Sequence, residues 1–240
     1  MNKHQVNKVI KATDLLVEKF GIPPRPAEKP DPVEMVIGTI LSQNTNDKNS
    51  YKAYLQLKEK YKTWDEIAEA ERSDIEKEIK TAGLGKQKSG AIKNFLTRLK
   101  IEKNIYSLDY LSDLTDLEAI EDLTKYNGVG VKTASCVLLF ALDRNVCPVD
   151  THVNRIVNRL GIVKASTPDK TFFLLNENFP ADIAHRFHTN LIRLGREVCK
   201  PQKPACLSCP LIKVCKYDGK TKQRVVQAKE NAFMLLDNIK

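Results

Sequence analysis

The chain of 240 residues is long enough to bury a hydrophobic core, either as one large domain or as two smaller ones. Its formal net charge of +9 and its pI near 9.2 favour a polyanionic partner, nucleic acid above all. The longest apolar run, at 136–142, is too short to cross a bilayer, and the chain starts with a charged amphipathic segment instead of a signal sequence. We therefore expect an intracellular protein without a membrane partner.

Helix-start signals recur along the chain, whereas strand signals are scarce. The first helix is expected over 2–20, ended by Gly21 and a proline-rich linker at 22–32. After each later start, apolar residues recur at helical spacing. The sequence therefore predicts an all-α fold with about ten helices. A cap is also predicted at Thr167, before Pro168. Capping boxes predict four further helix starts, and they pair Asp31 with Glu34, Thr63 with Glu66, Ser73 with Glu76 and Thr115 with Glu118.

A Gly-apolar-Gly turn, Gly128-Val129-Gly130, leads into an expected helix whose second residue is Lys132. Glycines can take backbone conformations closed to other residues, and without a Cβ they let a phosphate approach the amides of the turn. A lysine at this place lies within reach of a bound sugar-phosphate and suits a nucleophile acting on DNA. Most such turns are only tight turns, so this interpretation depends on the rest of the chain.

Asp150 stands directly before a helical run that ends at Leu160-Gly161. An aspartate in this position is most often an N-cap. A carboxylate near a nucleophilic lysine also stabilises the positive charge that a sugar develops when its glycosidic bond breaks. Because an anion favours the ammonium form of a lysine, we expect Asp150 to act on the sugar cation or on proton transfer, and not to activate Lys132.

Four of the six cysteines crowd into 199–215, in the pattern C-x6-C-x2-C-x5-C. In a reducing compartment this crowding indicates metal ligation. A single C-x2-C pair in one irregular loop favours a [4Fe-4S] cluster, with a structural zinc site as the alternative. Lys200 and Lys203 lie in the same loop and are expected to be exposed, either solvated or in contact with phosphates. The predicted ligands are Cys199, Cys206, Cys209 and Cys215.

Four features in this order and spacing resemble endonuclease III, a member of the helix-hairpin-helix DNA glycosylase superfamily. They are the hairpin 128–134, the segment Val149-Asp150-Thr151-His152, the segment Leu194-Gly195-Arg196 and the cysteine spacing. The resemblance runs from about Asp31 to Tyr217 and implies two helical domains. The implied division is 31–143 for the domain with the helix-hairpin-helix at about 116–142, 1–22 plus 144–216 for an iron-sulfur domain, and 217–240 for a C-terminal extension. We expect this extension to be a docked amphipathic helix or an interaction tail.

The resemblance also implies residue roles. Lys132 matches the lysine that attacks C1′ of the damaged nucleotide and forms a Schiff base, and Asp150 matches the catalytic aspartate. Gln43 matches the residue that fills the gap left by the flipped lesion, and Leu84 matches the wedge on the opposite strand. The residues alone, without the resemblance, favour an ordinary polar residue at a helix end for Gln43 and an ordinary apolar loop residue for Leu84. With the hairpin residues and the two lysines of the cysteine loop, the full set of expected DNA contacts is Gln43, Leu84, Gly128, Gly130, Val131, Lys200 and Lys203.

Two positions depart from the family pattern. Asn127 stands where proline usually precedes the hairpin, and we expect a looser turn that keeps its amides. Gly85 follows Leu84 where an aromatic residue is frequent, which puts the contact with the opposite base in doubt.

The implied activity is that of a bifunctional DNA glycosylase and AP lyase of base excision repair, which removes oxidised pyrimidines from duplex DNA. The expected protein is monomeric, cytoplasmic and nucleoid-associated. A mismatch-type glycosylase that removes adenine or thymine is the first alternative, but such enzymes typically carry serine or tyrosine in place of Lys132. A non-catalytic DNA-binding iron-sulfur protein is the second, and it has no need of Lys132 and Asp150 together.

Overall fold

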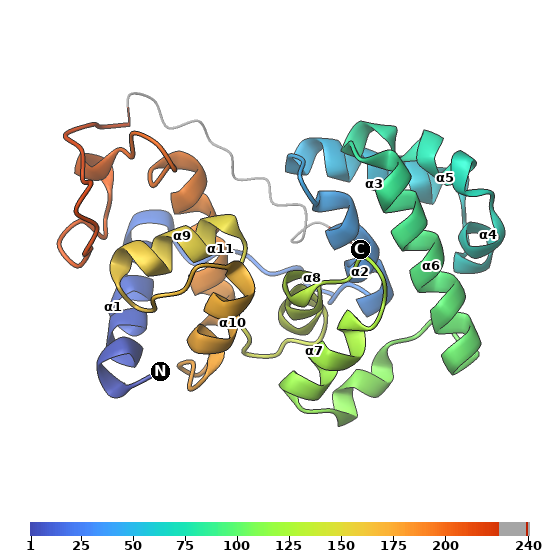
Figure 1. Ribbon diagram of the computed structural model, residues 1–240, viewed down its shortest axis with the longest axis horizontal. Coiled ribbons are helices and arrows are strands. Elements are labelled where there is room, and N and C mark those ends of the chain that lie inside the picture. The colour runs from blue at the N-terminus through green and yellow to red at the C-terminus, as the bar shows by residue number, and fades with distance from the viewer. Residues whose placement is uncertain (226–238, 240) are drawn as a thin grey trace. The chain divides into compact units, whose positions relative to one another are not determined.

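The computed structural model describes residues 1–225 and 239 (Figure 1). This described part is helical and contains no β-strand, so the all-α prediction is confirmed. Its α-helices are α1 (Lys3–Phe20), α2 (Pro32–Ser42), α3 (Asp47–Lys60), α4 (Trp64–Glu69), α5 (Arg72–Glu78), α6 (Gly85–Lys103), α7 (Asp116–Thr124), α8 (Val131–Cys136), α9 (Thr151–Leu160), α10 (Pro168–Asn176) and α11 (Ala184–Glu197). The short elements are the 3-10 turns η1 (Lys80–Ala82), η2 (Asp109–Asp113) and η4 (Cys206–Ser208), and the π-helical turn η3 (Val137–Ala141).

Side-chain caps explain where most of the helices begin. Asn2 and Thr115 each form a reciprocal capping box, which starts α1 and α7. Thr63 caps α4 without the predicted box, because the Glu66 carboxylate accepts a hydrogen bond from Lys62 N at 2.7 Å instead. Thr167 caps α10, whose first residue is Pro168. At the other end of α1, Gly21 takes φ 81°, a left-handed value that favours glycine and ends the helix where predicted.

Two further capping predictions need correction. The α5 helix begins at Arg72 after Glu71, so Ser73 lies inside the first turn and not before it. Asp31 does cap α2, but its predicted box partner Glu34 turns toward another helix, where its carboxylate accepts a hydrogen bond from Lys58 Nζ at 2.7 Å. Glu34 is largely buried, and a buried carboxylate is stabilised more by a cationic partner than by the neutral backbone amide that a capping box provides.

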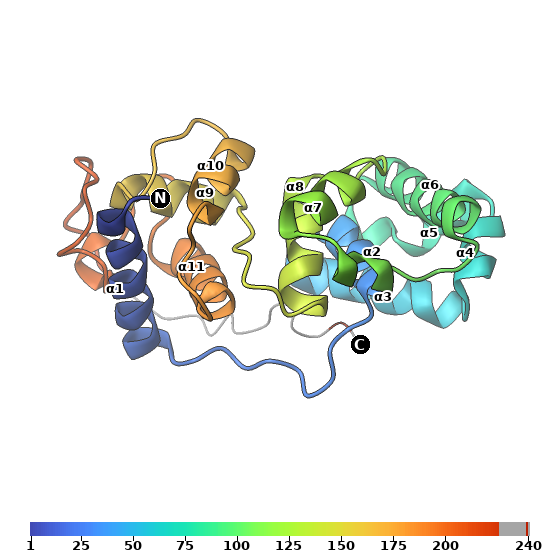
Figure 2. The same cartoon turned by 90° about the horizontal axis from the view of Figure 1, so that it is seen from below.

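The described chain divides into two compact units. Of the described residues, unit 1 contains Met1–Pro24 and 145–225, and unit 2 contains Arg25–Arg144 and Ile239. In unit 1, α11 packs against both α1 and α9 (Figure 2). Of the predicted C-terminal extension, residues 226–238 and 240 lie outside the described residues. Ile239 is buried against Gly38 of α2, where no space remains for a Cβ.

The α2 helix is the buried centre of unit 2. All of its residues from Pro32 to Leu41 are buried, because the segment is apolar apart from Glu34 and Thr39 and is surrounded by α3, α6, α8 and η3. The second hairpin helix was predicted over 131–142 as one α-helix. The helix runs from Val131 to Ala141, but its last part is the π-helical turn η3, which is closed by a hydrogen bond from Leu142 N to Val137 O at 3.1 Å. None of the helices in the described part has the length and apolar content that a bilayer crossing requires.

Candidate functional site

The turn between α7 and α8 is closed by a hydrogen bond. Val129 N donates to Tyr126 O at 3.0 Å, so the turn forms although Asn127 replaces the usual proline. Gly128 has φ 88°, and a Cβ added there would lie 2.5 Å from the Cβ of Ala91. Both the backbone conformation and the close packing therefore require glycine at this position.

Gly130 differs from Gly128. Its backbone is extended, with φ −95° and ψ 177°, a conformation open to any residue. Of the two glycines, only Gly128 uses the conformational freedom that glycine offers. Among the described residues, no heavy atom lies within 4 Å of a Cβ added at Gly130, which leaves space for a ligand close to the backbone.

Lys132 is the second residue of α8 and is half-buried, as is Val131 before it. The next four residues of the helix, from Thr133 to Cys136, are all buried, which fixes α8 within unit 2. The Ser135 hydroxyl donates to the carbonyls of Val131 and Lys132 at 2.8 and 3.0 Å. The lysine therefore stands at the first turn of an anchored helix, directly after the hairpin.

Gln43 is the C-cap of α2 and lies beside the hairpin turn. Its Nε2 donates to the carbonyl of Gly128 at 3.2 Å. Two predicted DNA contacts, which stand far apart in the sequence, thus meet in unit 2. The next residue, Asn44, has φ 52°, in the left-handed region.

Leu84 projects from the loop before α6. Its side chain is 48% exposed and its φ is 50°, a left-handed value that leucine rarely adopts. Such strained and exposed apolar residues concentrate at functional sites. A Cβ added at the next residue, Gly85, would lie 3.0 Å from Cγ of Glu76, so close packing against α5 gives a local reason for a residue without a side chain there.

Lys88 is a candidate site residue that the sequence analysis did not find. It is 2% exposed, and its Nζ donates to Leu41 O at 2.9 Å and to Ala82 O at 2.8 Å. Burial lowers the pKa of Lys88 to about 8, because the ammonium loses its hydration. One feature of the sequence indicates that Lys88 is buried. It stands four residues before Ile92, in line with the apolar face of α6.

Asp150 lies in unit 1, where it is the N-cap of α9. Its Oδ1 accepts a hydrogen bond from Val153 N at 2.7 Å, so the capping role considered for it is present. The neighbouring segments of the family pattern also pack together, because a Cβ added at Gly195 would lie 2.6 Å from Nδ1 of His152. Burial lowers the pKa of the His152 imidazole below its ordinary value.

Two arginines of α9, neither of them singled out by the sequence analysis, connect this helix to the cysteine loop. Arg155 Nε donates to Cys199 O at 2.9 Å, and its guanidinium also lies 3.1 Å from His152 Nδ1. Arg159 donates to Cys199 Sγ at 3.3 Å, and its own carbonyl accepts from the Cys215 thiol at 3.5 Å. The side-chain positions of α9 and of the loop are therefore coupled within unit 1.

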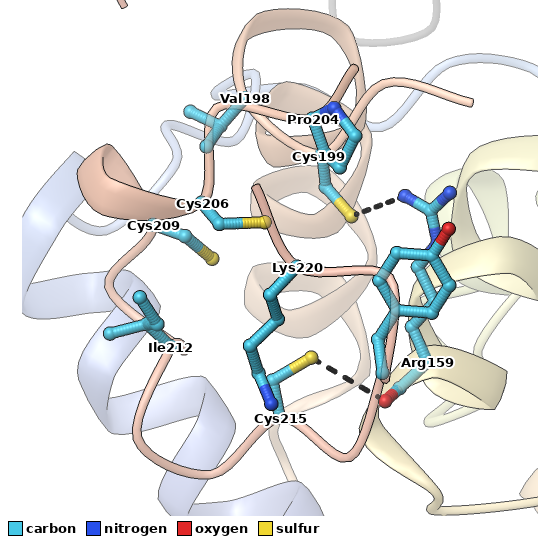
Figure 3. A pocket seen from close by; sticks show the side chains of 10 residues that line it. Arg159, Val198, Cys199, Pro204, Cys206, Cys209, Ile212, Cys215 and Lys220 are labelled. Carbon is cyan, nitrogen blue, oxygen red and sulfur yellow. Dashed lines mark hydrogen bonds between the residues drawn. The ribbon is translucent and has the colours of Figure 1, made fainter. Parts of the chain in front are cut away.

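The four predicted ligand cysteines line one pocket of unit 1, with Arg159 and Lys220 at its wall (Figure 3). Burial raises the pKa of the Cys209 thiol to about 12. In the part of the chain that the structure describes, no three His, Cys, Asp or Glu side chains form a group that could hold a metal ion. Lys200 and Lys203 are exposed, as predicted.

Comparison with known proteins decides the family. Residues 37–181 match the HhH-GPD superfamily of base excision DNA repair proteins. The chain belongs to this superfamily. An endonuclease III from Thermotoga maritima is 38% identical over 202 residues, which cover 84% of this chain and 89% of the relative. An endonuclease III from Sulfolobus acidocaldarius is 35% identical over 186 residues, covering 76% and 80%.

A solved structure supports the same assignment within the superfamily. A trapped covalent intermediate of endonuclease III with DNA matches with a TM-score of 0.73 and 28% identity, over 90% of this chain and 96% of that one. The predicted family and fold are therefore confirmed. The chain is an endonuclease III homologue, a DNA glycosylase and AP lyase of base excision repair.

Proposed function

We propose that this endonuclease III homologue removes oxidised pyrimidines from duplex DNA and cuts the strand at the resulting abasic site, with Lys132 as the nucleophile. The observation that carries the proposal is the position of Lys132 in the first turn of α8, next to the hairpin whose Gly128 carbonyl binds Gln43. A base-removing relative without lyase activity has no use for an amine at this place.

The proposed reaction has four steps. The neutral amine of Lys132 attacks C1′, the glycosidic bond breaks, and the base leaves with its bonding electron pair and takes up a proton. The sugar ring then opens as O4′ takes up the second proton that Nζ loses, which gives a Schiff base between C1′ and Nζ. Loss of a C2′ proton drives β-elimination of the 3′ phosphate, and water hydrolyses the imine to release Lys132.

We assign Asp150 to the charge that develops on the sugar. One carboxylate oxygen binds Val153 N, which holds the side chain in one orientation at the start of α9. Such a fixed anion stabilises an oxocarbenium-like sugar without reorganisation during the reaction.

The remaining predicted contacts position the duplex. We propose that Gln43 fills the gap left by the flipped lesion and that Leu84 enters the opposite strand. The amides around Gly128, Gly130 and Val131 would bind a phosphate, beside a surface pocket that also includes Arg98 and Lys125. Lys200 and Lys203 are exposed on the cysteine loop, and we propose that they contact other phosphates of the duplex. We also propose that the protein associates with the nucleoid, because its substrate is DNA.

We further propose that Cys199, Cys206, Cys209 and Cys215 hold a [4Fe-4S] cluster. The residues fit a cluster better than a single ion, because four thiols line one pocket although no three of them form a group for one metal ion. Cationic Arg159 and Lys220 line the same pocket, which suits the negative charge of a thiolate-bound cluster. When bound, the cluster supplies a cross-link between segments of the loop. It thereby holds the backbone that carries Lys200 and Lys203 in one shape.

Purified protein is expected to be brown, to absorb near the blue end of the visible range, and to contain about four iron atoms per chain with no zinc. Cys206→Ser should lower the iron content and the absorbance, whereas Cys147→Ser, at a buried cysteine outside the loop, should change neither. One equivalent of zinc in a colourless protein would identify a structural zinc site instead.

The wild-type reaction products test the proposed activity. On a duplex that carries thymine glycol, we expect the damaged strand to be cut without alkali, because the lyase step follows base removal on the same enzyme. A strand that stays intact until alkali is added would indicate a glycosylase without lyase activity, the mismatch-type alternative. A duplex of the same sequence without the lesion is the control and should stay intact in both conditions.

A further inference from the structure

A buried ammonium group joins two loops of unit 2. Lys88 extends from the buried face of α6 and is 2% exposed. Its Nζ donates to Leu41 O at 2.9 Å and to Ala82 O at 2.8 Å. The two acceptors belong to segments 41 residues apart in the sequence, so a single side chain bridges elements that the chain itself does not connect closely.

Both acceptor carbonyls lie at the ends of helical elements. Leu41 is in the last turn of α2, and Ala82 is the last residue of η1. Carbonyls at helix C-termini lack partners within their helix and carry partial negative charge. An ammonium offers three donors, so Lys88 can satisfy both carbonyls at once with charge-assisted hydrogen bonds.

Each of these carbonyls stands two residues before a proposed DNA-inserting side chain. Gln43 follows Leu41, and Leu84 follows Ala82. Both loops contain a non-glycine residue in the left-handed region, Asn44 at φ 52° and Leu84 at φ 50°. Such conformations cost free energy and persist only where the surrounding structure holds them.

We propose that Lys88 is a positioning residue that sets the Gln43 loop and the Leu84 loop at one fixed separation, so that both side chains enter the duplex together when the lesion leaves it. The inference rests on the proposed function of Gln43 and Leu84. An apolar side chain in place of Lys88 avoids the burial of a charge but leaves both carbonyls without their donor. The ammonium is itself buried within unit 2, which makes it a support for the loops and not a DNA contact.

Lys88→Met tests this role against a matched control on the same helix. Lys93 is also a lysine of α6 that donates to a backbone carbonyl, Ala70 O at 2.5 Å, but no proposed DNA contact follows Ala70. Excision of thymine glycol from a duplex is measured under single-turnover conditions. Borohydride trapping on a single-stranded abasic oligonucleotide is measured in parallel, because this substrate has no opposite strand and no gap in a base stack.

We expect Lys88→Met to lower excision in the duplex by about a hundredfold, as displaced positioning groups do, and to change single-strand trapping by no more than about twofold. Lys93→Met should leave both measurements at the wild-type level. An equal loss on both substrates, or no loss on the duplex, would overturn the proposal. If Lys88→Met does not fold, Lys88→Gln is measured on the same two substrates, because glutamine still has a hydrogen-bond donor but is shorter than lysine.

A double-mutant cycle asks whether Lys88 acts through the two loops. In a Gln43→Ala, Leu84→Ala background, Lys88→Met should cost little further duplex activity, because the side chains that it positions are gone. Full additivity of the two losses would contradict a positioning role. Failure of the proposed function itself is distinguishable, because wild-type protein would then give no trapped adduct on either substrate.

Discussion

Replacing Lys132 with glutamine is expected to lower strand cleavage at an abasic site by about a thousandfold or more, since removal of a nucleophile removes the covalent route. Glutamine has nearly the length and the helix propensity of lysine but no nucleophilic amine. Lys132 is half-buried in the first turn of α8, so we expect the free energy of unfolding to change by less than about 0.5 kcal/mol.

Cleavage of an abasic duplex and thermal unfolding are measured side by side for this variant. Lys170→Gln serves as the control, because Lys170 is an exposed lysine of α10 outside the proposed site, and it should keep wild-type cleavage. Cleavage by Lys132→Gln at the wild-type rate would show that another group is the nucleophile.

Asp150→Asn is expected to slow base excision by about 10²–10⁴-fold without loss of stability. Asparagine caps helices as well as aspartate does, so its side-chain oxygen can still accept from Val153 N. Only the negative charge is lost, and with it the stabilisation of the sugar cation. Asp150→Ala should lose both functions, with an added cost of about 0.5–2 kcal/mol in stability.

The excision rate and the unfolding temperature of these two variants separate the catalytic role from the capping role. Asp31→Asn makes the same chemical change at the N-cap of α2 and should leave excision unchanged. Wild-type excision by Asp150→Asn, combined with a loss of stability in Asp150→Ala, would reduce Asp150 to a helix cap.

Features that depend on residues close together in the sequence were predictable. Thr115 and Thr167 start the helices that their capping patterns indicate, and Gly21 ends α1. The hairpin, Asp150 and the cysteine spacing are equally local, which is why the family could be named from them. Glu34 departs from its local pattern, because it pairs with Lys58 on α3 and does not form the predicted capping box.

Features that depend on tertiary packing were not predictable. The role of Lys88 rests on a carbonyl 47 residues away, and a lysine in an apolar stripe gives no sign of which carbonyl it will bind. Gly128 and Gly130 look alike in the sequence, but only Gly128 packs against Ala91 and has a positive φ. Contacts of α9 through Arg155 and Arg159 likewise appear only once the cysteine loop is folded beside it.

Mapping the borohydride-trapped residue tests directly whether Lys132 is the nucleophile. Wild-type protein is incubated with an abasic duplex and borohydride, the adduct is digested, and the peptide that carries the reduced sugar is identified by mass spectrometry. We predict a single modified residue, Lys132, since it is the amine at the first turn of the hairpin helix. No adduct, or an adduct on a different amine, would show that Lys132 is not the nucleophile.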